Sequence, residues 1–198
     1  MMKILSFLAA ALLVAMISTY ATAATIELKD YGGLVLSLPN DEWPDIDPDM
    51  VGETNGVVGV INILYDKEDS NGAHENLAYV GIAASPDRED KLGDMDSWFE
   101  NYQLVQFLDW YRRGYDITEI SRERSDTIVS GMVAKRVNLV ISSKFGRSNI
   151  AALYFKDPSG KFRYAVFVFN PGGREGDVSP VVDLVKSDIS WPAKTTSQ

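Results

Sequence analysis

Several segments of the chain alternate apolar and polar residues with a period of two, which is the period of a β-strand. In the first segment Leu34, Leu36 and Leu38 share one side, and Pro39 ends the run. Residues 40–44 contain asparagine, aspartate and proline and are predicted to form a turn. Runs rich in β-branched and aromatic residues predict further strands at 57–65, 77–84, 115–123, 132–142, 149–155 and 161–169.

The connections between these segments favour antiparallel pairing. Residues 66–76 are polar, so the strands on either side of them are expected to form a hairpin with a long loop. A turn is expected at Gly131. The last two strands are joined by Asp157-Pro158-Ser159-Gly160, in which proline sets the first central turn residue and glycine accepts a positive φ.

The last two strands are apolar on both sides. Tyr154 and Phe155 are neighbours on one strand, and Val166 and Phe167 are neighbours on the other. Because adjacent residues of a strand point to opposite faces, both strands are expected in the middle of a sheet that is covered on each face. The pattern therefore predicts a sheet with helices on both sides.

Two helices are predicted to supply that cover. The longer one occupies residues 94–113, where Asp94 or Asp96 can cap the first turn and Gly114 ends the helix. The second starts at Ser179 as the capping residue, with Pro180 at its first position. Its apolar stripe is Val181, Val182, Val185 and Ile189.

The longer helix carries two apolar stripes that lie on roughly opposite sides at 100° per residue. The first stripe is Met95, Trp98, Phe99, Tyr102 and Val105, and the second contains Leu104, Phe107 and Tyr111, with Trp110 beside it. One stripe is enough to dock a helix on a sheet, so the second is predicted to be partly exposed and to bind a partner or ligand. The alternative is a break near Gln103 that turns both stripes towards the core. The candidate surface is Leu104, Phe107, Trp110 and Tyr111.

The first 23 residues have the pattern of a cleavable signal peptide. Lys3 supplies the positive charge, residues 4–17 form an apolar run of 14 residues, and Ala21-Thr22-Ala23 is a small-x-small cleavage site. A membrane-spanning helix takes about 20 apolar residues, so this run is short for an anchor. We expect a mature chain that begins at Ala24, forms one domain over residues 24–192, ends in a polar tail at 193–198 and is periplasmic or secreted.

Composition excludes several classes of function. The chain has no cysteine, which rules out disulfides, thiol catalysis and a lipid-anchored bacterial lipoprotein. Its formal charge is −9, and removal of Lys3 with the signal peptide takes it to −10. Such a domain is repelled by nucleic acid and by anionic lipid. The short basic pairs Arg122/Arg124 and Lys135/Arg136 are the nearest candidates for a local basic patch.

No residue pattern indicates a catalytic or metal site. His74 is the single histidine, and no serine lies in a G-x-S-x-G motif. Alternating aspartates at 45, 47 and 49 resemble the start of a calcium loop, but Met50 and Gly56 stand where an EF-hand needs glycine and an acid. We therefore expect no enzyme activity, no cofactor and no metal.

The order of elements resembles the PsbP/Mog1-type domain family. The resemblance rests on residues 34–43, 98–111, 117–131, 154–169 and 181–189. It implies an α+β fold, a three-layer α/β/α sandwich around a mainly antiparallel sheet. Family members include a nuclear GTPase-binding protein, extrinsic photosystem subunits and small bacterial envelope proteins, so the fold does not imply one active site.

The sequence thus leads to three hypotheses of function. The first is a non-enzymatic exported domain that binds a protein partner at the cell envelope. The second is a carrier of a small apolar ligand in a pocket between helix and sheet, and the third is a hydrolase with an unrecognised site.

Overall fold

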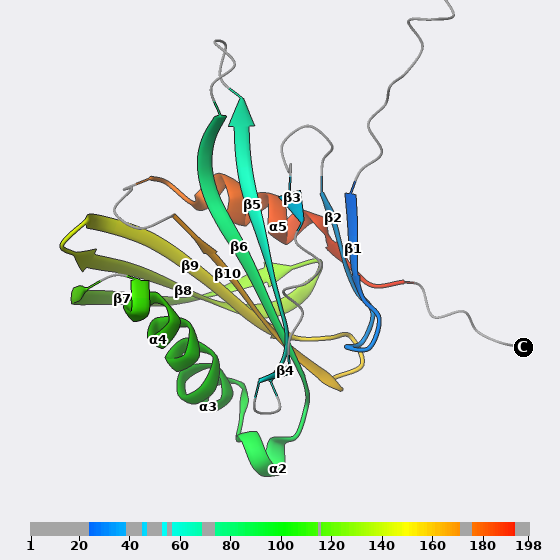
Figure 1. Ribbon diagram of the computed structural model, residues 1–198. Helices are drawn as coiled ribbons and strands as arrows, with labels where there is room; N and C mark the ends of the chain where they lie inside the picture. The colour runs from blue at the N-terminus through cyan, green and yellow to red at the C-terminus, as the bar shows by residue number, and fades with distance from the viewer. Residues whose placement is uncertain are drawn as a thin grey trace, which may run out of the picture.

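The computed structural model describes residues 24–38, 45–46, 53–54, 57–68, 74–114, 116–170 and 176–192. Most of them belong to a large antiparallel sheet with helices on both sides (Figure 1). This confirms the predicted α+β class. The sheet contains, in spatial order, β3 (Asp45–Ile46), β5 (Val57–Glu68), β6 (His74–Pro86), β10 (Phe162–Phe169), β9 (Gly146–Lys156), β8 (Met132–Ser143) and β7 (Ile117–Val129), and β4 (Glu53–Thr54) also pairs with β5.

One face of the sheet is covered by a bent helix and the other by a helix together with a small second sheet (Figure 1). The bent helix consists of α3 (Met95–Trp98), a π-helical turn η2 (Phe99–Leu104) and α4 (Val105–Gly114), preceded by the short α2 (Glu89–Leu92). The second face carries α5 (Ser179–Asp188) and the sheet of β1 (Ala24–Leu28), β2 (Leu34–Leu38) and β11 (Ile189–Ser190).

The two-faced strands lie where the sequence places them. β9 and β10 are adjacent in the middle of the sheet, and nearly all their side chains are buried. Leu153, Phe155 and Val166 enter the core under α5, whereas Tyr154 and Phe167 enter the core under α3 and α4. Burial on both faces stabilises the folded state by about 25 cal/mol for each Å² of apolar surface that is removed from water.

The turns that join the strands confirm two predictions. Gly160 has φ 71°, and its amide donates to the carbonyl of Asp157 at 2.9 Å. Ser130 and Gly131 both have positive φ, 48° and 80°, between the paired residues Val129 and Met132. This is the conformation that a two-residue hairpin turn between twisted strands requires.

The polar loop predicted at 66–76 is wrong at both of its ends. Residues 66–68 and 74–76 pair in β5 and β6, with His74 opposite Glu68. The β10 register stops at Tyr79, so this end of the hairpin extends beyond the other strands (Figure 1). Backbone hydrogen bonds prolong an antiparallel ladder whatever the polarity of the side chains, which is why polarity misled the prediction.

Two further expectations are corrected. The N-cap of α5 is Val178 rather than Ser179, and the Ser179 amide donates a hydrogen bond to Asp177 Oδ1 at 2.9 Å. The small sheet was not predicted, because strand periodicity is local and the residues that pair in it, such as Ile189 and Leu36, are far apart in the chain. The predicted signal peptide, the turn at 40–44 and the tail at 193–198 lie outside the described residues.

Candidate functional site

A π-helical turn in the bent helix decides which of its two stripes is buried. Trp98 and Phe99 contact the sheet, and after the turn Leu104 and Tyr111 also face it, leaving 4% and 1% of these two residues exposed. A π-helical turn contains more residues than an α-helical turn. The residues after η2 are therefore rotated relative to those before it, and the face that points to the sheet moves from the first stripe to the second. Tyr102 and Val105 of the first stripe are consequently exposed.

The prediction that the second stripe is exposed is therefore wrong for Leu104 and Tyr111. The alternative, a break near Gln103 that turns both stripes inward, describes these two residues correctly, and Gln103 itself is buried in η2. Phe107 is half-buried, and Trp110 is 52% exposed. Of the four predicted surface residues, only Trp110 has most of its side chain in solvent.

Aromatic rings fill the space between the bent helix and the sheet. Phe99 stacks on Tyr154 with 4.2 Å between ring centroids, and Phe107 stacks on Phe167 at 4.5 Å. Such stacked pairs stabilise by about 0.5–1.5 kcal/mol beyond their buried area. Trp110 lies at the edge of this cluster, 5.6 Å from Phe169 and 6.0 Å from Phe107. It is the point where the aromatic core reaches the surface.

A buried hydrogen bond fixes the end of α4 next to the first part of β9. The Tyr111 hydroxyl donates to Ser148 Oγ at 2.8 Å, and both residues are 1% exposed. On the same side, Lys144 in the turn between β8 and β9 forms an ion pair with Asp116, which follows α4, at 2.6 Å. These two links hold Trp110 and the β8–β9 turn at one end of the molecule.

Charged residues bind the bent helix to the edge strand β7. Glu100 forms ion pairs with Arg122 and Arg124, and Arg124 also contacts Asp96 at 3.4 Å. The Tyr154 hydroxyl donates to Asp96 at 2.8 Å. Burial and this hydrogen bond raise the pKa of Tyr154 well above its usual value. The basic pair Arg122/Arg124 noted in the sequence is thus occupied by carboxylates of the helix.

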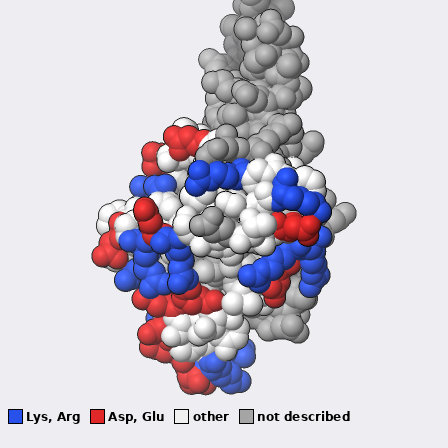
Figure 2. Space-filling view, turned by 90° about the vertical axis from the view of Figure 1, so that its left-hand side faces the viewer, with Lys and Arg blue, Asp and Glu red and all other residues white. Residues whose placement is uncertain are grey.

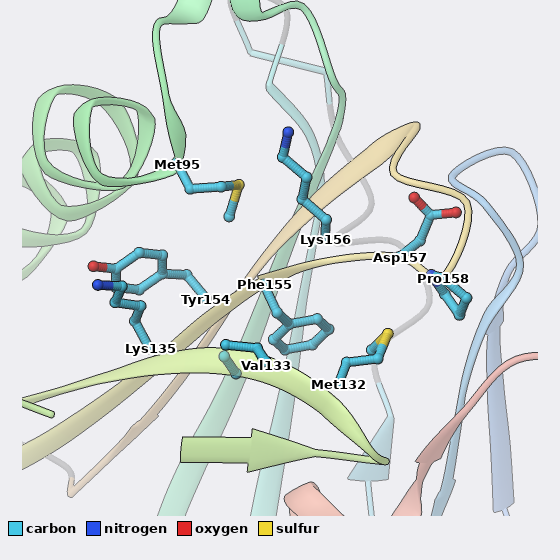
Figure 3. Close-up of a pocket in the computed structure, with 10 residues that line it drawn as sticks. Met95, Met132, Val133, Lys135, Tyr154, Phe155, Lys156, Asp157 and Pro158 are labelled. Carbon is cyan, nitrogen blue, oxygen red and sulfur yellow. The ribbon is translucent and has the colours of Figure 1, made fainter. Parts of the chain in front are cut away.

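An open hollow of about 490 Å³ lies where β8 and β9 diverge (Figure 3). The two strands stop pairing at Lys135 and Tyr154, although each continues beside its outer neighbour. Val133, which is 77% exposed, and Met95 of α3 line the hollow on the side of the bent helix. The hydrophobic pattern did not single out Val133, because a strand residue is assigned to core or solvent only when its neighbours in space are known.

The residues considered for chemistry do not come together. Within the residues that the structure describes, no group of three or more His, Asp or Glu is placed to hold a metal ion. His74 begins β6 rather than lying in a loop. No helix in the described ranges is long and apolar enough to cross a membrane. Of the alternating aspartates, Asp45 begins β3, while 47 and 49 lie outside the description.

The fold has a counterpart among solved structures. The solution structure of cyanobacterial PsbP (CyanoP) from Synechocystis superposes with a TM-score of 0.50, is 14% identical and covers 86% of this chain and 93% of its own. The chain therefore has a PsbP-like fold. A protein of unknown function from Pseudomonas aeruginosa, PA94, matches with a TM-score of 0.33 and 10% identity, covering 76% of this chain and 83% of its own. No family model and no curated protein matches the sequence.

Proposed function

We propose that this protein is a non-enzymatic, exported domain that binds a protein partner at the cell envelope. The observation that carries the proposal is Trp110, an aromatic side chain that is 52% exposed while it rests on the buried rings of the helix–sheet core. Tryptophan is among the side chains most enriched in the energetically important centres of protein interfaces. The PsbP-like fold by itself implies no active site, so the proposal rests on this surface residue.

Export is part of the proposal and rests on the N-terminal pattern. The predicted cleavage after Ala23 leaves β1 intact, because that strand begins at Ala24. Leu28 of β1 is buried in the core under α5, so the mature chain keeps every described residue that this core needs.

The proposal is tested by crosslinking in the cell that makes the protein. A photoreactive benzoylphenylalanine replaces Trp110 in one variant and Asp183, an exposed residue of α5, in the control. We expect a covalent adduct with one envelope protein, identified by mass spectrometry, from position 110 but not from position 183. Equal adducts from both positions, or none from position 110, would contradict the proposal.

A second candidate function is the binding of a small apolar ligand, and the hollow between β8 and β9 favours it. A volume of about 490 Å³ and a lining that includes Met95, Met132 and Val133 suit a small apolar molecule. Fluorescence of a hydrophobic dye should rise with the purified protein and return to baseline with Val133→Glu. An unchanged signal in this variant would exclude the hollow as the dye site.

A further inference from the structure

One end of the molecule combines exposed aromatic and basic side chains. We define the α4-end surface as Trp110, Arg112 and Arg113 of α4 with Lys144 and Phe145 of the β8–β9 turn. Trp110 is 52% and Phe145 is 53% exposed, and both arginines and Lys144 are also exposed. The hydrogen bond from Tyr111 to Ser148 and the ion pair from Lys144 to Asp116 hold the two segments together.

The cations of this surface outnumber the carboxylates that contact them. Arg112 is paired with Asp109 at 3.1 Å and Lys144 with Asp116 at 2.6 Å. Arg113 is exposed and forms no ion pair with any residue that the structure describes. Figure 2 faces this side of the molecule and shows several groups of basic side chains, with acidic side chains beside them. In a chain whose formal charge is −9, the excess of one cation among these five charged residues is opposite in sign to the molecule as a whole.

We propose that the α4-end surface docks an acidic segment of the partner protein, an inference that rests on the proposed partner-binding function. Charge complementarity carries it, because the guanidinium of Arg113, which pairs with no carboxylate in the described part of the chain, offers up to five N–H donors in the fork geometry that matches a carboxylate. The exposed rings of Trp110 and Phe145 supply apolar contact area at the same end of the molecule. Aromatic residues and arginine are the types enriched at interface centres.

The overall charge selects among anionic partners. A net charge of −9 repels a long polyanion such as nucleic acid, and it repels an anionic membrane, since both extend beyond the local cluster. A short acidic protein segment contacts the α4-end surface without approaching the rest of the acidic molecule. Its charge is expected to speed association and to set orientation.

The inference is tested by NMR titration of the isotope-labelled mature chain with two short blocked peptides. One peptide alternates leucine with glutamate, and the matched peptide alternates leucine with lysine. We expect the first to shift the Trp110 indole N–H and the amides of Arg113 and Phe145, and the second to shift none of them. Raising the ionic strength from about 0.1 M to about 1 M should weaken binding, because it shortens the Debye length from about 10 Å to about 3 Å.

Two charge reversals supply the variant and its control. Arg113→Glu should weaken binding of the acidic peptide by about tenfold or more, while Lys91→Glu on α2, an equal charge change at another exposed site, should leave it unchanged. Equal binding of both peptides, shifts that map elsewhere, or a single-stranded oligonucleotide that binds the same surface as tightly would each overturn the inference. Retention of the crosslink from position 110 in Arg113→Glu would reject the acidic segment and leave the proposed partner binding in place.

Discussion

Arg163 is a fully buried cation whose charge is neutralised by one carboxylate, that of Asp87. Its side chain is 0% exposed, its Nε donates to Asp87 Oδ1 at 2.5 Å, and its Nη1 donates to the carbonyl of Asp94 at 3.2 Å. Lys156 approaches the same carboxylate at 2.6 Å. Burial raises the pKa of Asp87, but its bonds to Lys156 and Arg163 outweigh burial and hold the pKa below its usual value.

Replacing Asp87 by asparagine should therefore destabilise the fold strongly at neutral pH. Removal of one partner leaves a buried charge uncompensated, which costs about 3–5 kcal/mol of unfolding free energy. Because the folded pKa of Asp87 is lowered, its contribution is present above the unfolded pKa of about 3.9 and is lost as pH falls through the folded pKa. Urea denaturation at neutral pH and near pH 3 measures both effects.

The gap between wild type and Asp87→Asn should shrink in acid, because below the unfolded pKa the unfolded carboxyl binds a proton that the folded carboxylate, with its lowered pKa, resists. Asp90→Asn is the matched control, because Asp90 is an exposed residue of α2. A gap of equal size at both pH values would show that Asp87 acts through hydrogen-bond geometry and not through its charge.

At the scale of elements, the π-helical turn η2 lets one helix bury two stripes in succession. Phe99 and Leu104 are five residues apart, yet both are buried against the same face of the sheet. In a continuous α-helix that spacing would place them about 140° apart, at 100° per residue. The extra residue in the turn absorbs the difference, and it moves Tyr102 to the solvent side.

Deleting Asn101, an exposed residue of η2, should convert the turn to ordinary α-helix and preserve the core contacts on both sides. The free energy of unfolding should change by less than about 1 kcal/mol, since a large cost arises only when buried side chains lose their packing. Thermal or urea denaturation measures it.

The control is deletion of Gln106, an exposed residue of α4 that lies beyond the turn. That deletion leaves η2 in place and rotates Phe107 and Tyr111 away from the sheet. It should cost about 3 kcal/mol or more, the range for losing a large buried side chain. Equal losses for the two deletions would mean that η2 does not set the rotation of α4.

At the scale of the whole molecule, the described residues form two cores on opposite faces of one sheet. Buried residues of β1, β2 and α5, including Leu28, Leu36 and Val182, pack on one face, and Trp98, Phe99 and Leu104 pack on the other. In each core, the side chains of the sheet and those of the elements that cover it come from distant parts of the chain. The strand nearest the predicted cleavage site, β1, is part of the first core.

The exported chain should begin at Ala24, at the start of β1. Signal peptidases cut after small residues at two positions, which Ala21 and Ala23 supply. Intact-mass measurement of the exported protein should give residues 24–198, and Ala23→Phe should accumulate the uncut form. A membrane-bound product that retains Met1 would contradict the export prediction.

Much of the sheet could be predicted from the sequence, because strand periodicity and turn chemistry are local properties. The two-faced pattern of residues 149–155 and 161–169 placed β9 and β10 in the middle of the sheet, and glycine at 160 marked the positive φ between them. The helix at 94–113 was predicted with nearly its observed ends for the same reason.

The tertiary structure decided which side chains of that helix remain at the surface. The sequence showed two apolar stripes, but whether a π-helical turn aligns them depends on the sheet against which they pack. As a result Leu104 and Tyr111 are core residues, whereas Trp110 is exposed. The α4-end surface could not be predicted from the sequence either, because it depends on the contact of Tyr111 with Ser148, which brings α4 and the β8–β9 turn to one end of the molecule. Local periodicity determined the elements, whereas contacts between residues distant in the chain determined the candidate surface.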